Sequence, residues 1–138
     1  MAKAAEFISQ YNRDEILAHE ETLLNKALIL AESIKGLKRV GTPSQHIAIL
    51  SFLIDRHHPQ DIGTLLDRQG IAVRTGHHCA MPLMEQLGIN GTIRASFSLY
   101  NTEQEVEALF NALHHIVESP AHYTALSDPP SQPGGSAA

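Results

Sequence analysis

The sequence predicts one small α+β domain, in which a mostly antiparallel sheet is covered by a long N-terminal helix and a C-terminal helix. Apolar residues recur with helical spacing near both ends of the chain, and short apolar runs separated by turn residues lie between them. With 138 residues, 43% of them hydrophobic, the chain is long enough to bury a core. We expect the domain to occupy residues 1–120, followed by a disordered tail over 121–138.

The first long helix is expected over residues 12–36. Asn12 suits its start, with Glu15 three residues later as a box-like partner, and Gly36 suits its end. Residues 1–10 either extend this helix or fray from it. The helical spacing is set by the apolar residues Ile16, Leu17, Leu23, Leu24, Ala27, Leu28, Ala31 and Ile34.

The middle of the chain alternates between strand-like and helix-like segments. Short runs rich in β-favouring residues predict buried strands. Prolines in a first turn, such as Pro59 and Pro82, and glycines after a last turn, such as Gly70 and Gly88, predict short helices. The predicted strands cover 46–54, 71–74 and 92–99, and the predicted helices cover 58–70 and 81–88.

The last helix is expected over residues 101–118, where Thr102 and Glu105 form a capping box ahead of an apolar periodic segment. After it the composition changes to "SDPPSQPGGSAA", which has almost nothing to bury. Segments of this kind stay disordered because they cannot offset the entropy of ordering.

Charge and cysteine content exclude several classes of protein. A net charge of −5 argues against a nucleic-acid-binding protein, which usually carries a basic face. No apolar run is long enough to span a bilayer, and the N-terminus turns polar too early for a secretory signal. A single cysteine forms no internal disulfide, so we expect a reducing cytoplasm.

That cysteine, Cys79, lies in the segment "RTGHHCAMP". Amide groups at the start of the following helix favour a thiolate, and His77 and His78 supply positive charge or move protons. Gly76 allows close approach or mobility. The alternative is that Cys79 is a small apolar residue that fills a gap, as free cysteines often are. The local sequence does not decide between these two interpretations.

A metal site would draw on the histidines near this segment and on Cys79. Adjacent residues rarely bind one ion together, and zinc ligands are usually spaced by two to four residues. We therefore expect no metal site. The residues weighed for it are His57, His58, His77, His78 and Cys79.

Arg74 and Arg94 each lie within or at the end of a predicted strand among apolar neighbours. An arginine there needs an anion or a hydrogen-bonding partner, and its planar fork matches a carboxylate. The alternative is a structural ion pair with one of the acidic residues. Spacing alone does not choose between these two.

The segments "GIAVRTGHHCAMPLM" and "GTIRASFSLYNTEQEVEAL" together resemble the C-terminal part of group II (Suf-type) cysteine desulfurases. Those enzymes are class V pyridoxal-phosphate enzymes, and the resemblance implies the small C-terminal domain of fold type I. It implies that Cys79 attacks the sulfur of cofactor-bound L-cysteine and keeps it as a persulfide. It also implies that Arg94 holds the substrate carboxylate, that Arg74 shapes the loop, and that Gly76, His77 and His78 belong to the catalytic loop.

The cofactor implied by the resemblance is pyridoxal phosphate, which needs a lysine. The four lysines, Lys3, Lys26, Lys35 and Lys38, all precede the first predicted strand, and none lies in the family's setting for the Schiff base. The large cofactor domain of the family is absent from this sequence. We therefore expect no cofactor on this chain alone and no desulfuration by it.

The partners that the resemblance implies are L-cysteine, a sulfur-acceptor protein for iron–sulfur cluster assembly, and a second subunit, since complete enzymes of the family are homodimers. Some relatives that donate to a zinc-containing scaffold carry "HPHD" where this chain has a glutamine, Gln60. This favours a zinc-free acceptor. The alternative is a non-catalytic module that docks on a sulfur acceptor or on a full-length desulfurase.

Overall fold

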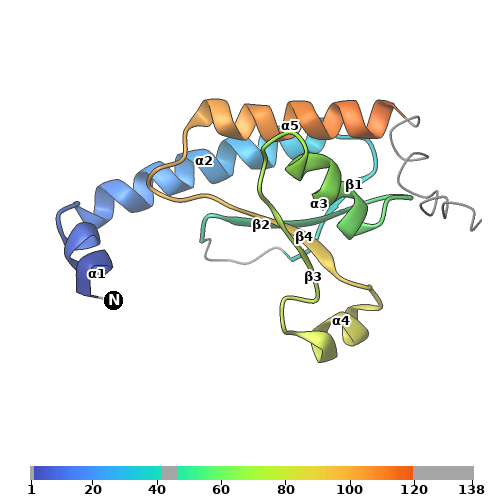
Figure 1. Cartoon of the computed structure of the whole chain (residues 1–138), viewed down its shortest axis with the longest axis horizontal. Coiled ribbons are helices and arrows are strands. Elements are labelled where there is room, and N and C mark those ends of the chain that lie inside the picture. Colours follow the sequence, from blue (N-terminus) through green and yellow to red (C-terminus); the bar gives the residue numbers. More distant parts are fainter. Residues whose placement is uncertain (1, 42–46, 120–138) are drawn as a thin grey trace, which may run out of the picture.

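The computed structural model describes residues 2–41 and 47–119. A short helix and a long helix open the chain, and a second long helix closes the described part (Figure 1). The elements in chain order are α1 (Ala2–Ser9), α2 (Arg13–Ser33), β1 (Leu37–Arg39), β2 (Ile49–Ile54), α3 (Pro59–Asp67), β3 (Arg74–Gly76), α4 (Met81–Leu87), β4 (Thr92–Ser96) and α5 (Glu103–Glu118).

The four strands form one antiparallel sheet in the order β1-β2-β4-β3. β4 is therefore an inner strand, hydrogen-bonded to β2 on one side and to β3 on the other. The predicted α+β class with a small antiparallel sheet is confirmed. The sheet has one strand more than we predicted from the sequence.

Helices cover one face of this sheet. α2 and α5 lie side by side over it, and α3 packs beside them, while α4 lies apart from α2 and α5 (Figure 1). Every second residue of a strand points toward these helices. Phe52 on β2 and Ile93 on β4 do so and are fully buried, in one core with Leu23 and Phe110. The predicted cover by a long N-terminal and a C-terminal helix is confirmed. The opposite face of the sheet carries the polar side chains described below.

Several element boundaries differ from the prediction. The first strand of the sheet, β1, was missed because "LKR" has only one apolar residue and becomes a strand by pairing with β2. The predicted strand 71–74 was wrong over residues 71–73, since the ladder with β4 uses Arg74 to Gly76. The strand predicted over 92–99 ends at Ser96.

The helix boundaries also differ. Residues 2–9 form a separate helix, so the two alternatives of extension and fraying were both wrong. α2 ends at Ser33, before Gly36, which lies in the following turn with φ 79°. The helices predicted over 58–70 and 81–88 end at Asp67 and Leu87. Position 46 and the predicted tail over 121–138 lie outside the described residues.

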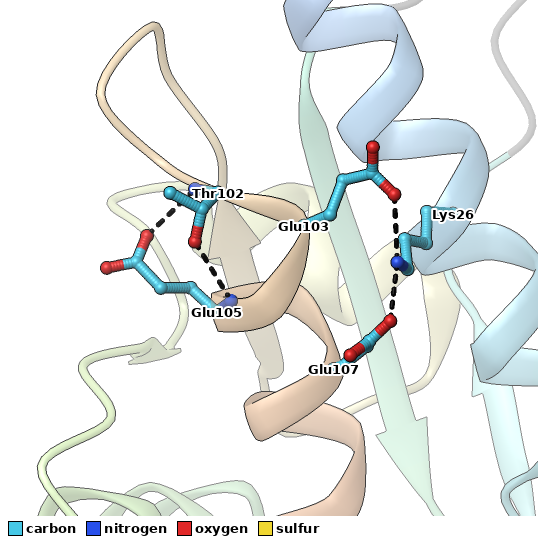
Figure 2. A network of polar contacts seen from close by, with 5 residues as sticks. All are labelled: Lys26, Thr102, Glu103, Glu105 and Glu107. Carbon is cyan, nitrogen blue, oxygen red and sulfur yellow. Dashed lines mark hydrogen bonds and ion pairs between the residues drawn. The ribbon is translucent and has the colours of Figure 1, made fainter.

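The helix starts are capped largely as predicted. Thr102 and Glu105 form both hydrogen bonds of a capping box at the start of α5 (Figure 2). The Asn12 side chain caps α2 by accepting from the N–H of Asp14, and Glu15 takes no part in that cap. None of the helices among residues 2–41 and 47–119 is long and apolar enough to cross a membrane.

A cluster of charges joins the two covering helices. The ammonium of Lys26 on α2 contacts Glu103 at 2.8 Å and Glu107 at 2.6 Å, both on α5 (Figure 2). The three side chains are exposed enough that solvent screens much of their attraction. The cluster links α2 to α5, and α5 is the next element after β4.

Candidate functional site

The face of the sheet opposite the helices carries several polar residues of the inner strands. On β4, Ile93 and Ala95 point to the core and are buried, so Thr92 and Arg94 belong to the other face. On β2, Ser51 lies directly opposite Arg94. The alternation of buried and polar residues along β4 therefore assigns Thr92 and Arg94 to one surface.

Arg94 lies at the centre of this surface. Its cross-strand neighbours are Ser51 on β2 and Arg74 on β3. The Arg94 side chain is partly buried, and its Nε–H has no hydrogen-bond partner among the described residues. No acidic residue of the described chain forms an ion pair with Arg94, so the alternative of a structural ion pair finds no support there. A guanidinium with a buried, unused donor is suited to bind an anion that enters from solvent.

Arg74 opens β3 at the edge of the sheet and is exposed. Because Arg74 and Arg94 are direct cross-strand partners, their side chains leave the same face of the sheet. The sequence separated them by twenty positions and gave no indication of this pairing. Two guanidinium groups on one face make this region electropositive although the chain as a whole carries a net charge of −5.

The segment that carries Cys79 leaves β3 at Gly76 and enters α4 at Met81. Gly76 has a φ of 109°, which suits glycine, but His78 at 53° and Cys79 at 61° are also left-handed. The turn is closed by the N–H of Ala80, which donates to the carbonyl of His77 at 2.9 Å. Cys79 is exposed, so the interpretation of this residue as a buried gap-filler is wrong.

His78 ties this loop to the sheet. Its Nε2 lies 2.8 Å from the hydroxyl oxygen of Thr92, and Thr92 is only 2% exposed. Burial lowers the pKa of His78, and the positive charges of Arg94 and Arg74 lower it further, against the opposing effect of Thr92. The imidazole is therefore kept neutral near neutral pH. Its Nδ1 is buried and has no partner among the described residues.

Thr92 is the residue that we missed from the sequence. Its only signal was a threonine two positions before Arg94 on a predicted strand, a spacing that places both side chains on one face. His77, by contrast, is exposed and lines a hollow together with His58, Gln60 and Asn90. The structure thus gives different settings to two histidines that are adjacent in sequence.

The histidines weighed for a metal site have other roles. His58 caps α3 by accepting from the N–H of Gln60 at 3.3 Å, and His57 Nδ1 lies 2.9 Å from the carbonyl oxygen of Asp55. Within residues 2–41 and 47–119, no group of three or more His, Cys, Asp or Glu side chains is placed to hold a metal ion.

The lysines do not fit the role of a cofactor anchor beside this site. Lys26 contacts Glu103 and Glu107, and Lys38 contacts Asp55 at 2.8 Å. Lys3 on α1 pairs with its helix neighbour Glu6 at 3.0 Å. Lys35 is exposed beyond the end of α2. The described part of the chain thus offers a guanidinium with an unpaired donor at Arg94 and an exposed thiol at Cys79, while three of its four lysines are paired with carboxylates.

Comparison with known proteins gives consistent matches. Residues 1–109 match the protein family described as aminotransferase class-V. A cysteine desulfurase from Escherichia coli (strain K12 / DH10B) is 40% identical over 116 residues, which cover 84% of this chain and 28% of that protein. A probable cysteine desulfurase 1 from Mycobacterium leprae is 36% identical over 118 residues, which cover 86% of this chain and 19% of that protein.

Solved structures agree with these matches. The apo structure of a cysteine desulfurase from Thermococcus onnurineus NA1 superposes with a TM-score of 0.77 at 34% identity, covering 82% of this chain and 28% of that one. The cysteine desulfurase CsdA from Escherichia coli, in an S-sulfonic acid form, gives a TM-score of 0.75 at 34% identity with the same coverage. The chain spans less than a third of the length of these relatives.

Proposed function

Since this chain belongs to the class-V aminotransferase family, we propose that it is the persulfide-carrying C-terminal domain of a group II (Suf-type) cysteine desulfurase. The observation that carries the proposal is the arrangement around β4. An exposed thiol lies on a loop tied to Thr92, and a guanidinium with an unused donor lies two residues further along the same strand. Such a domain must supply two chemical groups, a nucleophile and a group that binds the substrate carboxylate.

The reaction transfers one sulfur atom from L-cysteine to Cys79. The Cβ–Sγ bond of the substrate breaks, and its electron pair stays with the carbon, which takes up a proton to give L-alanine. A sulfur–sulfur bond forms at Cys79, so the thiol becomes a persulfide, and the numbers of hydrogens and electrons balance. The two sulfur atoms are oxidised and the carbon is reduced, so no external oxidant is needed.

The residues of this chain take three roles in that reaction. Cys79, exposed on its loop, attacks the substrate sulfur as a thiolate. Arg94 holds the α-carboxylate of L-cysteine through its fork of N–H donors, and Arg74 adds a second positive charge from the neighbouring strand. Gly76, His77 and His78 complete the loop that presents the thiol. The carboxylate clamp orients the substrate so that its sulfur faces Cys79.

Pyridoxal phosphate supplies the electron sink that carbon–sulfur cleavage requires in such an enzyme. The described lysines, engaged with carboxylates or distant from the site, do not fit its attachment here. We therefore assign the cofactor to a part of the protein beyond these residues and expect no turnover by this chain alone. The attack by Cys79 and the binding of the carboxylate by Arg94 need no lysine of this chain.

The same proposal includes a destination for the sulfur. A persulfide on an exposed loop is open to attack by the thiol of an acceptor protein, and we place that transfer in cytoplasmic iron–sulfur cluster assembly, with the complete enzyme as a homodimer. Gln60 lines the hollow beside the loop together with His58 and His77. An amide is a weaker zinc ligand than an imidazole, which favours an acceptor without zinc.

A chimera tests the proposed function. The 116-residue segment of the Escherichia coli desulfurase that aligns with this chain is replaced by this chain, and the product is supplied with pyridoxal phosphate and L-cysteine. We expect release of L-alanine and one added sulfur atom on the Cys79 peptide by mass spectrometry. Cys79→Ser in the same chimera is expected to carry no added sulfur and to lose turnover.

A folded chimera that binds the cofactor but neither releases alanine nor gains sulfur at Cys79 would contradict the proposal. That result would favour the docking module instead. The isolated chain serves as the second control, because we expect it to gain no absorbance of a bound cofactor when pyridoxal phosphate is added.

A further inference from the structure

The contact between His78 and Thr92 joins a loop with left-handed residues to β4, an inner strand of the sheet. Thr92 is 2% exposed and is the one polar residue that is buried among the described residues. A buried hydroxyl needs a hydrogen-bond partner, and the Nε2 of His78 at 2.8 Å supplies it. The contact spans fourteen positions of sequence, so it constrains the loop in a way that no local hydrogen bond does.

The loop needs such a constraint because two of its consecutive residues are left-handed. His78 has a φ of 53° and Cys79 a φ of 61°. Each costs about 1–2 kcal/mol for a residue with a β-carbon, although histidine tolerates this region better than most. Such a conformation persists only where the surroundings hold it. α4 holds the loop at its far end, where Leu83 and Met84 donate to the carbonyl of Ala80 at 3.1 Å, and Thr92 holds it at the near end.

The anchor of the loop and the anion-binding arginine lie on the same strand. Thr92 and Arg94 are two residues apart on β4, so their side chains leave the same face about 7 Å apart. β4 is hydrogen-bonded to strands on both sides, which fixes that spacing. The position of Cys79 relative to Arg94 is therefore set through a single strand.

We propose that His78 is a positioning residue, whose hydrogen bond to Thr92 holds the Cys79 thiol at a fixed separation from the Arg94 guanidinium. A carboxylate bound by Arg94 is then held at a fixed separation from the sulfur of Cys79. The role in desulfuration rests on the proposed function, but the positioning itself is a property of this chain. A neutral imidazole suits this role, because a third positive charge beside Arg74 and Arg94 would compete for the same anion.

Two alkylating reagents of similar size measure this separation in the isolated chain. Iodoacetate carries a carboxylate and iodoacetamide does not. In both, the thiolate sulfur attacks the methylene carbon, and iodide leaves with the electron pair of the broken carbon–iodine bond. The ratio of the two second-order rate constants at Cys79 thus reports how strongly the positive charge of the arginines favours an anion at the sulfur, which depends on their separation from it. The only cysteine of the chain is Cys79, so the rates need no correction for other thiols.

We expect the ratio of iodoacetate to iodoacetamide rates to be about fivefold higher in the native chain than in the chain unfolded in urea, which is the upper end of the effect of one solvent-exposed charge pair. Arg94→Gln lowers the ratio to the unfolded value. Thr92→Val keeps the shape of the side chain and both arginines but removes the hydroxyl, and it lowers the ratio as well. Thr92→Ser restores the hydroxyl and retains the native ratio.

Two further variants keep the test decisive. Thr75→Val makes the same change on the neighbouring strand, toward the opposite face of the sheet, and leaves the ratio unchanged. If Thr92→Val fails to fold, as judged by circular dichroism and the urea midpoint, His78→Asn replaces it. Asparagine tolerates a left-handed backbone but is one bond too short to reach Thr92, so it lowers the ratio too.

A native ratio in folded Thr92→Val or His78→Asn overturns the positioning role, and so does a wild-type ratio equal to that of the unfolded chain. This failure is distinguishable from failure of the proposed function. If the chimera releases alanine and the ratio is unchanged in Thr92→Val, the proposed function holds and the positioning role of His78 does not. If the chimera is inactive and the ratio falls in Thr92→Val, the positioning role holds and the proposed function does not.

Discussion

Arg74 lies directly opposite Arg94 in the antiparallel pair of β3 and β4. Like charges in that position repel each other, so the pair costs stability unless an anion lies between or above the two groups. Among the described residues, the buried Nε–H donor of Arg94 also has no partner. Both observations support the proposal that Arg94 binds a carboxylate, and a small carboxylate is the simplest probe of it.

Acetate is expected to stabilise the chain through this site. At equal ionic strength, replacing sodium chloride by sodium acetate should raise the thermal midpoint of the wild-type chain by roughly 2–4 °C more than that of Arg94→Gln. The difference between the two proteins removes the general effect of the salt on the solvent. Equal shifts in both proteins, measured by differential scanning fluorimetry, would show that Arg94 binds no carboxylate.

The His78 imidazole should make stability depend on pH just below neutrality. Its pKa is lowered in the folded chain, by burial first and then by Arg94, so the unfolded chain binds the proton more readily. The stabilising contribution is present above the ordinary histidine pKa of about 6.5 and is lost as the pH falls through the lower, folded pKa. Urea midpoints between pH 7 and pH 5 should fall less steeply in His78→Asn than in the wild-type chain. Parallel pH profiles of the two proteins would refute this.

The cluster of Lys26, Glu103 and Glu107 should act at the two extremes of pH. Hydrogen bonding to Lys26 lowers the pKa of Glu103, so this contribution is present above the ordinary glutamate pKa of about 4.3 and is lost below it. The same contacts raise the pKa of Lys26, so its contribution is present below the ordinary lysine pKa of about 10.4 and is lost as the pH rises past the folded value.

Lys26→Met is the variant that checks this pair of transitions. We expect it to flatten both the acid and the alkaline loss of stability, followed by urea unfolding across the pH range. Lys38→Met is its control, because it removes a lysine that is 68% exposed, paired with Asp55 outside the α2–α5 contact. If Lys38→Met flattened the profile as much as Lys26→Met, the cluster would have no special role.

The capping box of α5 should be measurable on its own. Thr102 accepts from the N–H of Glu105 at 3.2 Å, and the Glu105 carboxylate accepts from the N–H of Thr102 at 3.0 Å. Thr102→Ala should lower the free energy of unfolding by about 1 kcal/mol. Thr22→Ala, at an exposed position in the middle of α2, removes a hydroxyl from a helix interior and should be neutral or slightly stabilising. Equal losses in the two variants, in urea unfolding, would count against the cap.

Gly91 should tolerate alanine less well than Gly88. Both have a positive φ, of 123° and 66°, so both pay for a left-handed backbone. Only at Gly91 does a β-carbon meet other atoms, at 2.9 Å from the carbonyl carbon and oxygen of Gly76. We expect Gly91→Ala to destabilise the chain by roughly 1–3 kcal/mol more than Gly88→Ala, because the backbone at the base of the Cys79 loop must shift. Similar urea midpoints would contradict this close approach.

Local features of the fold were predictable from the sequence. The period of apolar residues predicted α2 and α5, and the Thr102–Glu105 box predicted where α5 begins. These features depend on contacts between residues three or four positions apart, which a sequence displays directly. β1 was not predictable in this way, because Leu37 to Arg39 becomes a strand only by pairing with β2. The shift of β3 from 71–74 to Arg74–Gly76 has the same cause, since its partner is β4.

For the candidate site, too, some features could be predicted from the sequence and others depended on the tertiary structure. The sequence by itself determined which residues are the chemical candidates, a single thiol at Cys79 and the arginines at 74 and 94, because reactivity and charge belong to the residue type. Only the tertiary structure decided that Arg74 faces Arg94, that Cys79 is exposed, and that His78 reaches Thr92 rather than solvent. The physical reason is that strand pairing and burial join residues far apart in the chain, and their partners are chosen by the packing of the whole domain rather than by their neighbours.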